Sequence, residues 1–130
     1  MHSARLALIS GAFLGLTGVI LGAMAAHYLE NILTPDKLSS FETAVRFQMY
    51  HAIALLVLGG LVLRFPDRWL AWSVRGILFG VLLFSGSIYL LTLTELPIGL
   101  VTPLGGMVLI LGWAAVLLWA FNVNVNGASD

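Results

Sequence analysis

The sequence contains no cysteine and few charged residues. Without cysteine, the chain forms no disulfide and no thiolate-ligated zinc or iron–sulfur site. Its six basic and six acidic residues make up 9% of the chain and give zero net charge. Typical soluble domains carry about 25% charged residues. So few basic residues form no basic surface, which excludes nucleic acid as an expected partner. Low charge together with 60% hydrophobic residues excludes disorder and predicts an integral membrane protein.

Four apolar segments are each long enough to cross a membrane, which takes about 20 apolar residues. Thr102 followed by Pro103 predicts the start of the last helix, because threonine caps helices and proline fits the first helical position. The connections are short, so the predicted fold is an all-α, antiparallel four-helix bundle formed by a single membrane domain. We expect spans at about 6–29, 41–63, 69–94 and 98–121, followed by a polar tail at 122–130.

The first segment has an alternative interpretation as a cleaved signal peptide. Met1–Arg5 resembles a positively charged leader, and Ala23–Ala25 resembles a cleavage site. The apolar run is much longer than the usual signal-peptide core of 7–15 residues. We therefore favour a retained membrane span.

Small residues recur at helical spacing on three of the four segments. Membrane helices associate through such residues because lipid tails provide no hydrophobic driving force between them. We expect packing within the bundle, with a homodimer seam as the open alternative. The predicted packing residues are Gly11, Gly15, Gly18, Gly22, Ser73, Gly76, Gly80, Ser87, Gly105, Gly106 and Gly112.

The basic residues also predict an orientation. Of the six, Arg5, Arg64, Arg68 and Arg75 fall on the side of the membrane that holds both termini, and Lys37 and Arg46 fall on the other. Because basic residues favour the cytoplasmic side, both termini are expected in the cytoplasm.

Polar side chains gather in the half of the membrane opposite the termini, and the other half is almost purely apolar. Intramembrane polar residues mark interhelical contacts or functional sites. The candidate cluster consists of His27, Glu42, Arg46, Gln48, Tyr50, His51, Ser85, Tyr89 and Thr102.

Several interpretations of this cluster stay open. His27, Glu42 and His51 have the donor types of a two-histidine, one-carboxylate metal site, and the two histidines could ligate haem. Gln48 and His51 are expected to form interhelical hydrogen bonds, with a proton relay as the alternative. Glu42 and Arg46 are spaced for an ion pair on one helix face. The sequence identifies no cofactor and no nucleophile–base pair.

Four stretches carry a resemblance to a known family: GAMAAH at 22–27, FETAVRFQMYHAIALL at 41–56, LFSGSIYLLTLT at 83–94 and TPLGGMVLILGW at 102–113. In these stretches the chain resembles the domain of unknown function 423 proteins, also called transmembrane protein 256-like or YgdD-like. The resemblance implies a small four-span protein of the bacterial inner membrane and implies no activity. Family members often have glycine where Ala25 stands and tyrosine where Phe47 stands.

These features favour a non-enzymatic accessory protein whose environment is the lipid bilayer and whose partner is another membrane protein or a second copy of the chain. The alternative is a binding or transport protein for a small ligand, lipid headgroup, metal or proton at the polar cluster. An enzyme acting on a lipid or quinone ranks third, because no catalytic spacing supports it.

Overall fold

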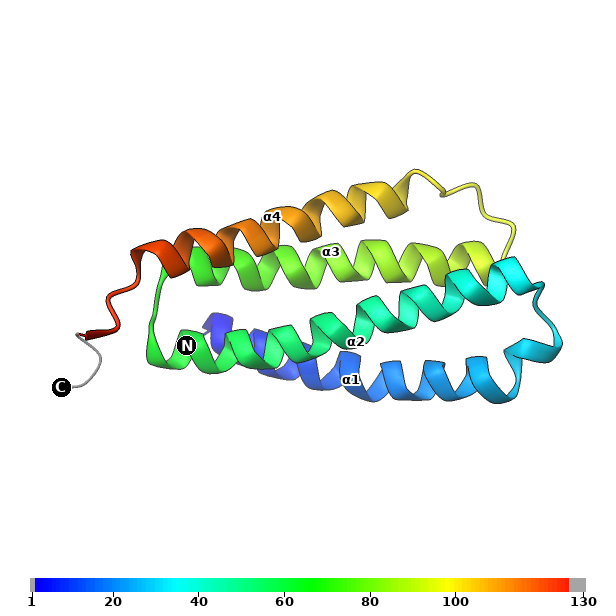
Figure 1. Ribbon diagram of the computed structural model, residues 1–130, viewed down its shortest axis with the longest axis horizontal. Helices are drawn as coiled ribbons and strands as arrows, with labels where there is room; N and C mark the ends of the chain where they lie inside the picture. The colour runs from blue at the N-terminus through cyan, green and yellow to red at the C-terminus, as the bar shows by residue number, and fades with distance from the viewer. Residues whose placement is uncertain (1, 127–130) are drawn as a thin grey trace.

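In the computed structural model, which describes residues 2–126, the chain forms four long α-helices and one short 3-10 helix. All four α-helices are long and apolar enough to cross a membrane. This confirms the predicted all-α, four-helix fold. The last four residues of the expected polar tail lie outside the described residues. The elements are α1 (His2–His27), η1 (Leu29–Asn31), α2 (Pro35–Arg64), α3 (Arg68–Leu93) and α4 (Val101–Asn122) (Figure 1).

The helix starts follow local capping chemistry at α2 and α3. The Thr34 side chain accepts a hydrogen bond from the Lys37 amide, and Pro35 occupies the first helical position. Asp67 caps α3 by accepting from the Trp69 amide at 2.7 Å. The predicted cap of α4 was wrong: its N-cap residue is Leu100, which makes no side-chain capping bond.

Successive helices run antiparallel, so both ends of the described chain lie at the same end of the bundle (Figure 1). We call this the terminal end; it includes the connection at 65–67. The opposite, loop end includes the connections at 28–34 and 94–100.

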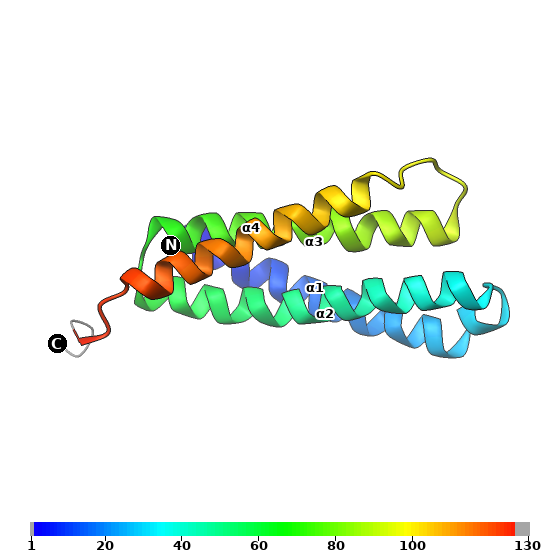
Figure 2. The same ribbon diagram turned by 45° about the horizontal axis from the view of Figure 1, so that its top comes forward.

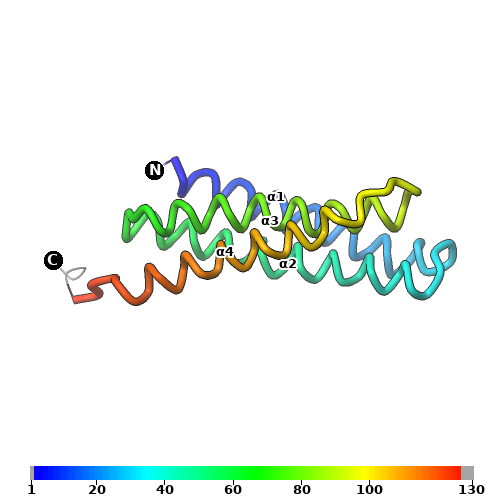
Figure 3. Tube along the Cα trace, turned by 90° about the horizontal axis from the view of Figure 1, so that it is seen from above, coloured from blue at the N-terminus to red at the C-terminus, as the bar shows by residue number. Residues whose placement is uncertain are grey.

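The helices pack in chain order, α1 on α2, α2 on α3 and α3 on α4 (Figures 2 and 3). α1 also contacts α3, whereas no Cα atom of α4 lies within 8 Å of one in α1 or α2. The four helices therefore do not close into a ring. The backbone of α4 lies close only to that of α3, so α4 is at the edge of the bundle.

Two apolar clusters fill the interior. The larger lies toward the terminal end and middle of the bundle, where Leu55, Leu70 and Ile77 are fully buried. The smaller lies at the loop end, where Ala25 and Leu29 pack with Phe41. Burial of these side chains leaves most other large apolar residues on the outside, as expected for helices that face lipid.

Glycines let α4 lie directly against α3. A Cβ atom built on Gly105 would meet the Phe84 Cα at 2.8 Å, and one on Gly80 would meet the Leu109 amide nitrogen at 2.8 Å. A Cβ on Gly112 would lie 3.0 Å from the Ile77 nitrogen. These are contacts with backbone, which cannot move aside as a side chain can.

The other predicted packing residues lie in more varied surroundings. On α1, a Cβ on Gly11 would lie 2.9 Å from the Ala52 carbonyl oxygen, and one on Gly18 would lie 2.5 Å from Met49 Sδ. Gly15, Gly22 and Gly106 have room for a Cβ atom, whose nearest neighbours would be 3.4 Å away or more. Gly76 faces Gly112 on α4, and Ser73 is fully buried with no hydrogen-bond partner for its hydroxyl among the described residues.

Candidate functional site: polar contacts between the helices

Gln48 on α2 connects three helices near the middle of the bundle. Its side chain is 4% exposed. Its Nε2 donates to the Leu14 carbonyl oxygen at 2.9 Å and to Thr17 Oγ1 at 2.8 Å, both on α1. Its Oε1 accepts from the hydroxyl of Tyr89 on α3 at 2.6 Å. An amide in apolar surroundings needs such partners, so the network fixes the positions of α1, α2 and α3 relative to one another.

Two serines on α3 make further contacts between helices. Ser85 Oγ donates to the Ala44 carbonyl oxygen on α2 at 2.8 Å. Ser87 Oγ donates to the Phe84 carbonyl oxygen at 2.9 Å and is also bonded to Thr102 Oγ1 on α4. Since the one proton of Ser87 is used on Phe84, Thr102 acts as the donor in the bond between the two hydroxyls. Thr102 thus joins α4 to α3 in place of its predicted role as a helix cap.

His51 joins α2 to α4, although the two backbones stay apart. The Trp113 indole Nε1 donates to His51 Nε2 at 3.1 Å, and His51 Nδ1 lies 2.6 Å from the Phe47 carbonyl oxygen. Indole nitrogen is only a donor, so His51 Nε2 must be unprotonated and the ring proton must lie on Nδ1. The imidazole is neutral in this arrangement, and both of its nitrogens have partners.

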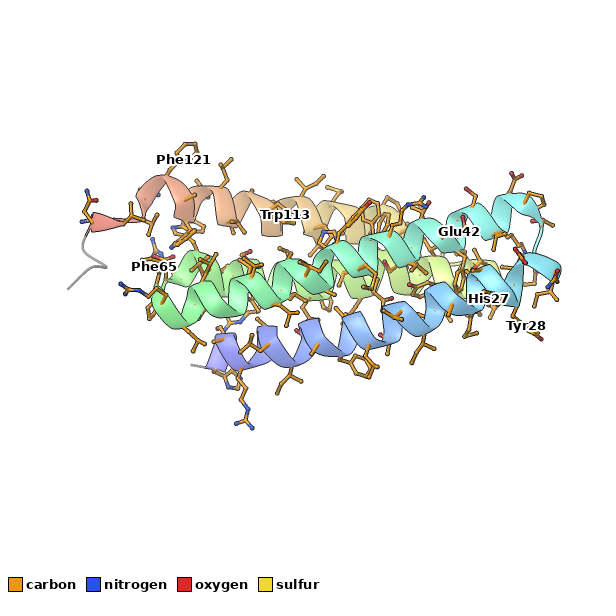
Figure 4. The ribbon with its side chains drawn as sticks, turned by 60° about the horizontal axis from the view of Figure 1, so that its bottom comes forward. His27, Tyr28, Glu42, Phe65, Trp113 and Phe121 are labelled. Carbon is orange, nitrogen blue, oxygen red and sulfur yellow. The ribbon has the colours of Figure 1, made fainter. Side chains whose placement is uncertain are left out.

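The remaining members of the predicted cluster lie on the outside. His27 is exposed at the end of α1, and Glu42, Arg46 and Tyr50 occupy the exposed face of α2. Figure 4 shows His27 and Glu42 toward the loop end and Trp113 near the middle of the bundle's length. The structure therefore brings together Gln48, His51, Ser85, Tyr89 and Thr102 as interhelical contacts and leaves the other four apart from them.

Two arrangements considered from the sequence do not form. Within residues 2–126, no three histidine or acidic side chains come close enough to hold a metal ion, so His27, Glu42 and His51 do not converge. The predicted Glu42–Arg46 ion pair is absent as well. Arg46 instead donates to Thr43 Oγ1 at 3.0 Å, and the ion pair found in the described part of the chain joins Lys37 to Glu95 at 3.8 Å.

Sequence reasoning missed three residues at the contacts between helices, two of them polar and one a glycine. Thr17 and Trp113 were not assigned partners, although each carries a polar group within a long apolar segment. Gly59 was not among the packing residues, yet a Cβ there would lie 2.8 Å from the Leu8 side chain. A polar group in the middle of an apolar run is the signal that would have singled out Thr17 and Trp113.

These helices and their buried interhelical hydrogen bonds define a polytopic α-helical membrane protein. The model of a family described as protein of unknown function (DUF423) matches residues 21–106. The chain belongs to this family, as its resemblance indicated. No solved structure matches the chain.

Relatives match nearly the whole chain. It is 38% identical over 119 residues to a UPF0382 membrane protein of Staphylococcus saprophyticus, covering 89% of this chain and 97% of that one. It is 34% identical over 128 residues to the UPF0382 inner membrane protein YgdD of Escherichia coli K12, covering 98% of each. The names of these relatives agree with a membrane location and state no activity.

Proposed function

We propose that the chain is a non-enzymatic accessory protein of the bacterial inner membrane that binds another membrane protein through the exposed face of α2. This face, which we call the α2 outer face, is formed by Glu42, Arg46 and Tyr50. Tyr50 carries the proposal because it is exposed at the level of the middle of the bundle and its hydroxyl makes no hydrogen bond to the described chain.

The position of Tyr50 makes it energetically unfavourable for its hydroxyl to stay without a hydrogen-bond partner. The side chain is 60% exposed, and its neighbour in sequence, His51, lies level with Trp113 near the middle of α4. The Tyr50 hydroxyl makes no hydrogen bond within residues 2–126. Lipid tails offer no acceptor, whereas a helix of a partner protein offers carbonyl oxygens or polar side chains. Arg46 and Glu42 extend the same polar face toward the loop end.

The buried polar groups support a non-enzymatic role. Gln48, Tyr89 and the two bonded serines, Ser85 and Ser87, use their hydrogen-bonding groups on other helices or on their own backbone. Both nitrogens of His51 are occupied in the same way. Nucleophilic catalysis by a hydroxyl requires a base within hydrogen-bond reach, and no serine or threonine of the described chain is bonded to the His51 imidazole. These side chains stabilise the bundle.

Site-specific photocrosslinking tests the partner. A benzoylphenylalanine at position 50 should give one defined protein adduct in native membranes, and the same probe at the exposed position Leu16 on α1 should give none. Tyr50→Phe should reduce co-purification of the crosslinked protein without lowering the melting temperature. An adduct of twice the chain mass would replace the accessory role with self-association. Adducts with lipid alone at both positions would overturn the proposal.

We also propose that both termini lie in the cytoplasm. Four of the six basic residues lie at the terminal end of the bundle, and Lys37 and Arg46 lie toward the loop end. The excess of basic residues at the terminal end supports this orientation. The loop end then faces the extracytoplasmic side.

A ligand-binding role is the second candidate function. It is favoured by a groove between α2 and α4 that opens at the loop end and is described below.

A further inference from the structure

Two adjoining pockets form a groove between α2 and α4. The pocket at the loop end has a volume of about 540 Å3 and is floored by Ile88 and Leu91 of α3. The second pocket, nearer the middle of α4, has a volume of about 450 Å3 and is lined by Phe47 and Met107. Pro103 lines both pockets, so they adjoin at the start of α4. The groove exists because α4 packs on α3 and keeps its backbone away from α2.

The groove is lined by both polar and apolar side chains at the loop end and becomes almost wholly apolar further in. On α2, one helical stripe carries Lys37, Ser40 and Thr43 into the first pocket and then Phe47 and His51 into the second. The α4 wall changes in the same direction, with Thr102 in the first pocket and Gly106, Met107 and Ile110 in the second. An amphipathic molecule with a polar head toward the loop end matches this gradient.

The length of the groove matches one leaflet of a bilayer. From Asp36 to His51 the α2 wall rises about 22 Å at 1.5 Å per residue. Half of a bilayer that is 40–45 Å thick with its headgroup regions is about 20–22 Å. The hydrogen bond between Trp113 and His51 bridges the two walls at the inner end. A lipid chain entering from the loop end would therefore stop near the bilayer centre.

The charges at the mouth are balanced. Asp36 and Lys37 line the first pocket, and Glu95 lies 3.8 Å from the Lys37 ammonium. Arg46 brings a second cation to the rim through its bond to Thr43, which lines the pocket. Two cations and two carboxylates suit a headgroup that carries both signs. A phosphate would bind Lys37 and Arg46, and an ammonium would bind the carboxylates.

We propose that this groove binds one phospholipid with a zwitterionic ammonium–phosphate headgroup, one of its two acyl chains lying against Phe47 and Met107. The site can be tested apart from a protein partner, because Lys37, Phe47 and Met107 lie outside the α2 outer face and the groove shares only Arg46 with it. Phosphatidylethanolamine has the required headgroup, and phosphatidylglycerol with the same acyl chains lacks the ammonium.

Native mass spectrometry of the purified chain in detergent, titrated with each lipid, tests the site. We expect one phosphatidylethanolamine per chain, phosphatidylglycerol bound at least about tenfold more weakly, and no competition by free glycerophosphoethanolamine, which lacks the acyl chains. Lys37→Gln should weaken binding about tenfold by removing a charge-assisted contact to phosphate. Equal binding of the two phospholipids, or full competition by the free headgroup, would overturn the proposal.

A matched pair of tryptophan variants tests the acyl-chain portion. Met107, 63% exposed, lines the second pocket, whereas Leu104, 57% exposed and one turn away on α4, lines neither pocket. Met107→Trp should fill the groove and abolish phosphatidylethanolamine binding, and Leu104→Trp should retain it. If Met107→Trp does not fold, Ile110→Trp replaces it, because Ile110 lines the same pocket. Equal phosphatidylethanolamine binding by the Met107→Trp and Leu104→Trp variants would contradict the site. The photocrosslink from position 50 should persist in both variants.

Discussion

At the scale of single residues, two tyrosine hydroxyls have opposite surroundings. The Tyr89 hydroxyl donates to Gln48 inside the bundle, and that bond belongs to a network that reaches Leu14 and Thr17. The Tyr50 side chain is 60% exposed, and its hydroxyl makes no hydrogen bond to the described chain. The same chemical change, loss of one hydroxyl, should therefore have different effects on the isolated protein at the two positions.

Tyr89→Phe should lower the free energy of unfolding by about 1 kcal/mol, because interhelical hydrogen bonds in membrane proteins contribute about 0.6 kcal/mol on average and at most about 1.7 kcal/mol. Gln48→Leu should lower it by about 2 kcal/mol, since it leaves the Tyr89 hydroxyl buried without an acceptor. Tyr50→Phe should leave it unchanged. Reversible unfolding in mixed micelles measures all three variants.

The double variant Gln48→Leu with Tyr89→Phe provides the control for the network. The double variant should lose less unfolding free energy than the sum of the losses of the two single variants, because Tyr89→Phe removes the hydroxyl that Gln48→Leu left without a partner. Additive losses, or equal effects of Tyr50→Phe and Tyr89→Phe, would show that the bond between Tyr89 and Gln48 contributes nothing.

At the scale of helices, the apolar runs were sufficient to predict four membrane segments, but the helix starts required tertiary contacts. Thr34–Pro35 and Thr102–Pro103 are the same dipeptide. The first caps α2 as its chemistry indicates, while Thr102 lies inside α4 and bonds Ser87. A hydroxyl that faces a neighbouring helix can form a hydrogen bond to that helix instead of capping its own. The sequence of one helix does not show which residue of a neighbour it will face.

The two faces of α2 show the same limit of prediction from the sequence of a single helix. Helical spacing separates Tyr50 and Arg46 from Gln48 and His51, and the structure places the first two outside and the last two inside. Which of the two faces meets α1 and α3 depends on glycines of another helix, such as Gly11, against which Ala52 packs. Periodicity gives the angle between side chains on one helix and leaves the position of the partner helix undetermined.

The contact between α3 and α4 leads to a prediction for adjacent glycines. Gly105→Ala should lower the free energy of unfolding by about 1–3 kcal/mol, because its Cβ would collide with the backbone of Phe84 and separate the helices. Gly106→Ala should be close to neutral, since its Cβ would meet the Phe84 ring at 3.8 Å, an ordinary contact. Thermal melting in detergent, calibrated by unfolding titrations, compares the two. Equal effects would mean that α4 can shift without cost.

At the scale of the whole molecule, the two ends of the bundle differ in charge. The loop end carries acidic residues beside its two basic ones, including the Lys37–Glu95 pair at the mouth of the groove. The terminal end carries four arginines, and three of them lie beside aromatic rings: Arg64 near Phe65, Arg68 near Trp69 and Arg75 near Trp72. Arginine and aromatic side chains together favour the membrane interface, with arginine favouring its cytoplasmic side.

The absence of cysteine allows a direct test of the orientation that this asymmetry predicts. Single cysteines at two exposed asparagines, Asn31 at the loop end and Asn124 beyond α4, report the two ends without a competing thiol. In intact spheroplasts, a membrane-impermeant maleimide should label Asn31→Cys and should label Asn124→Cys only after lysis, because the arginine-rich end is retained in the cytoplasm. The reverse pattern would contradict the proposed orientation and would place Lys37, Glu95 and the mouth of the groove in the cytoplasmic leaflet.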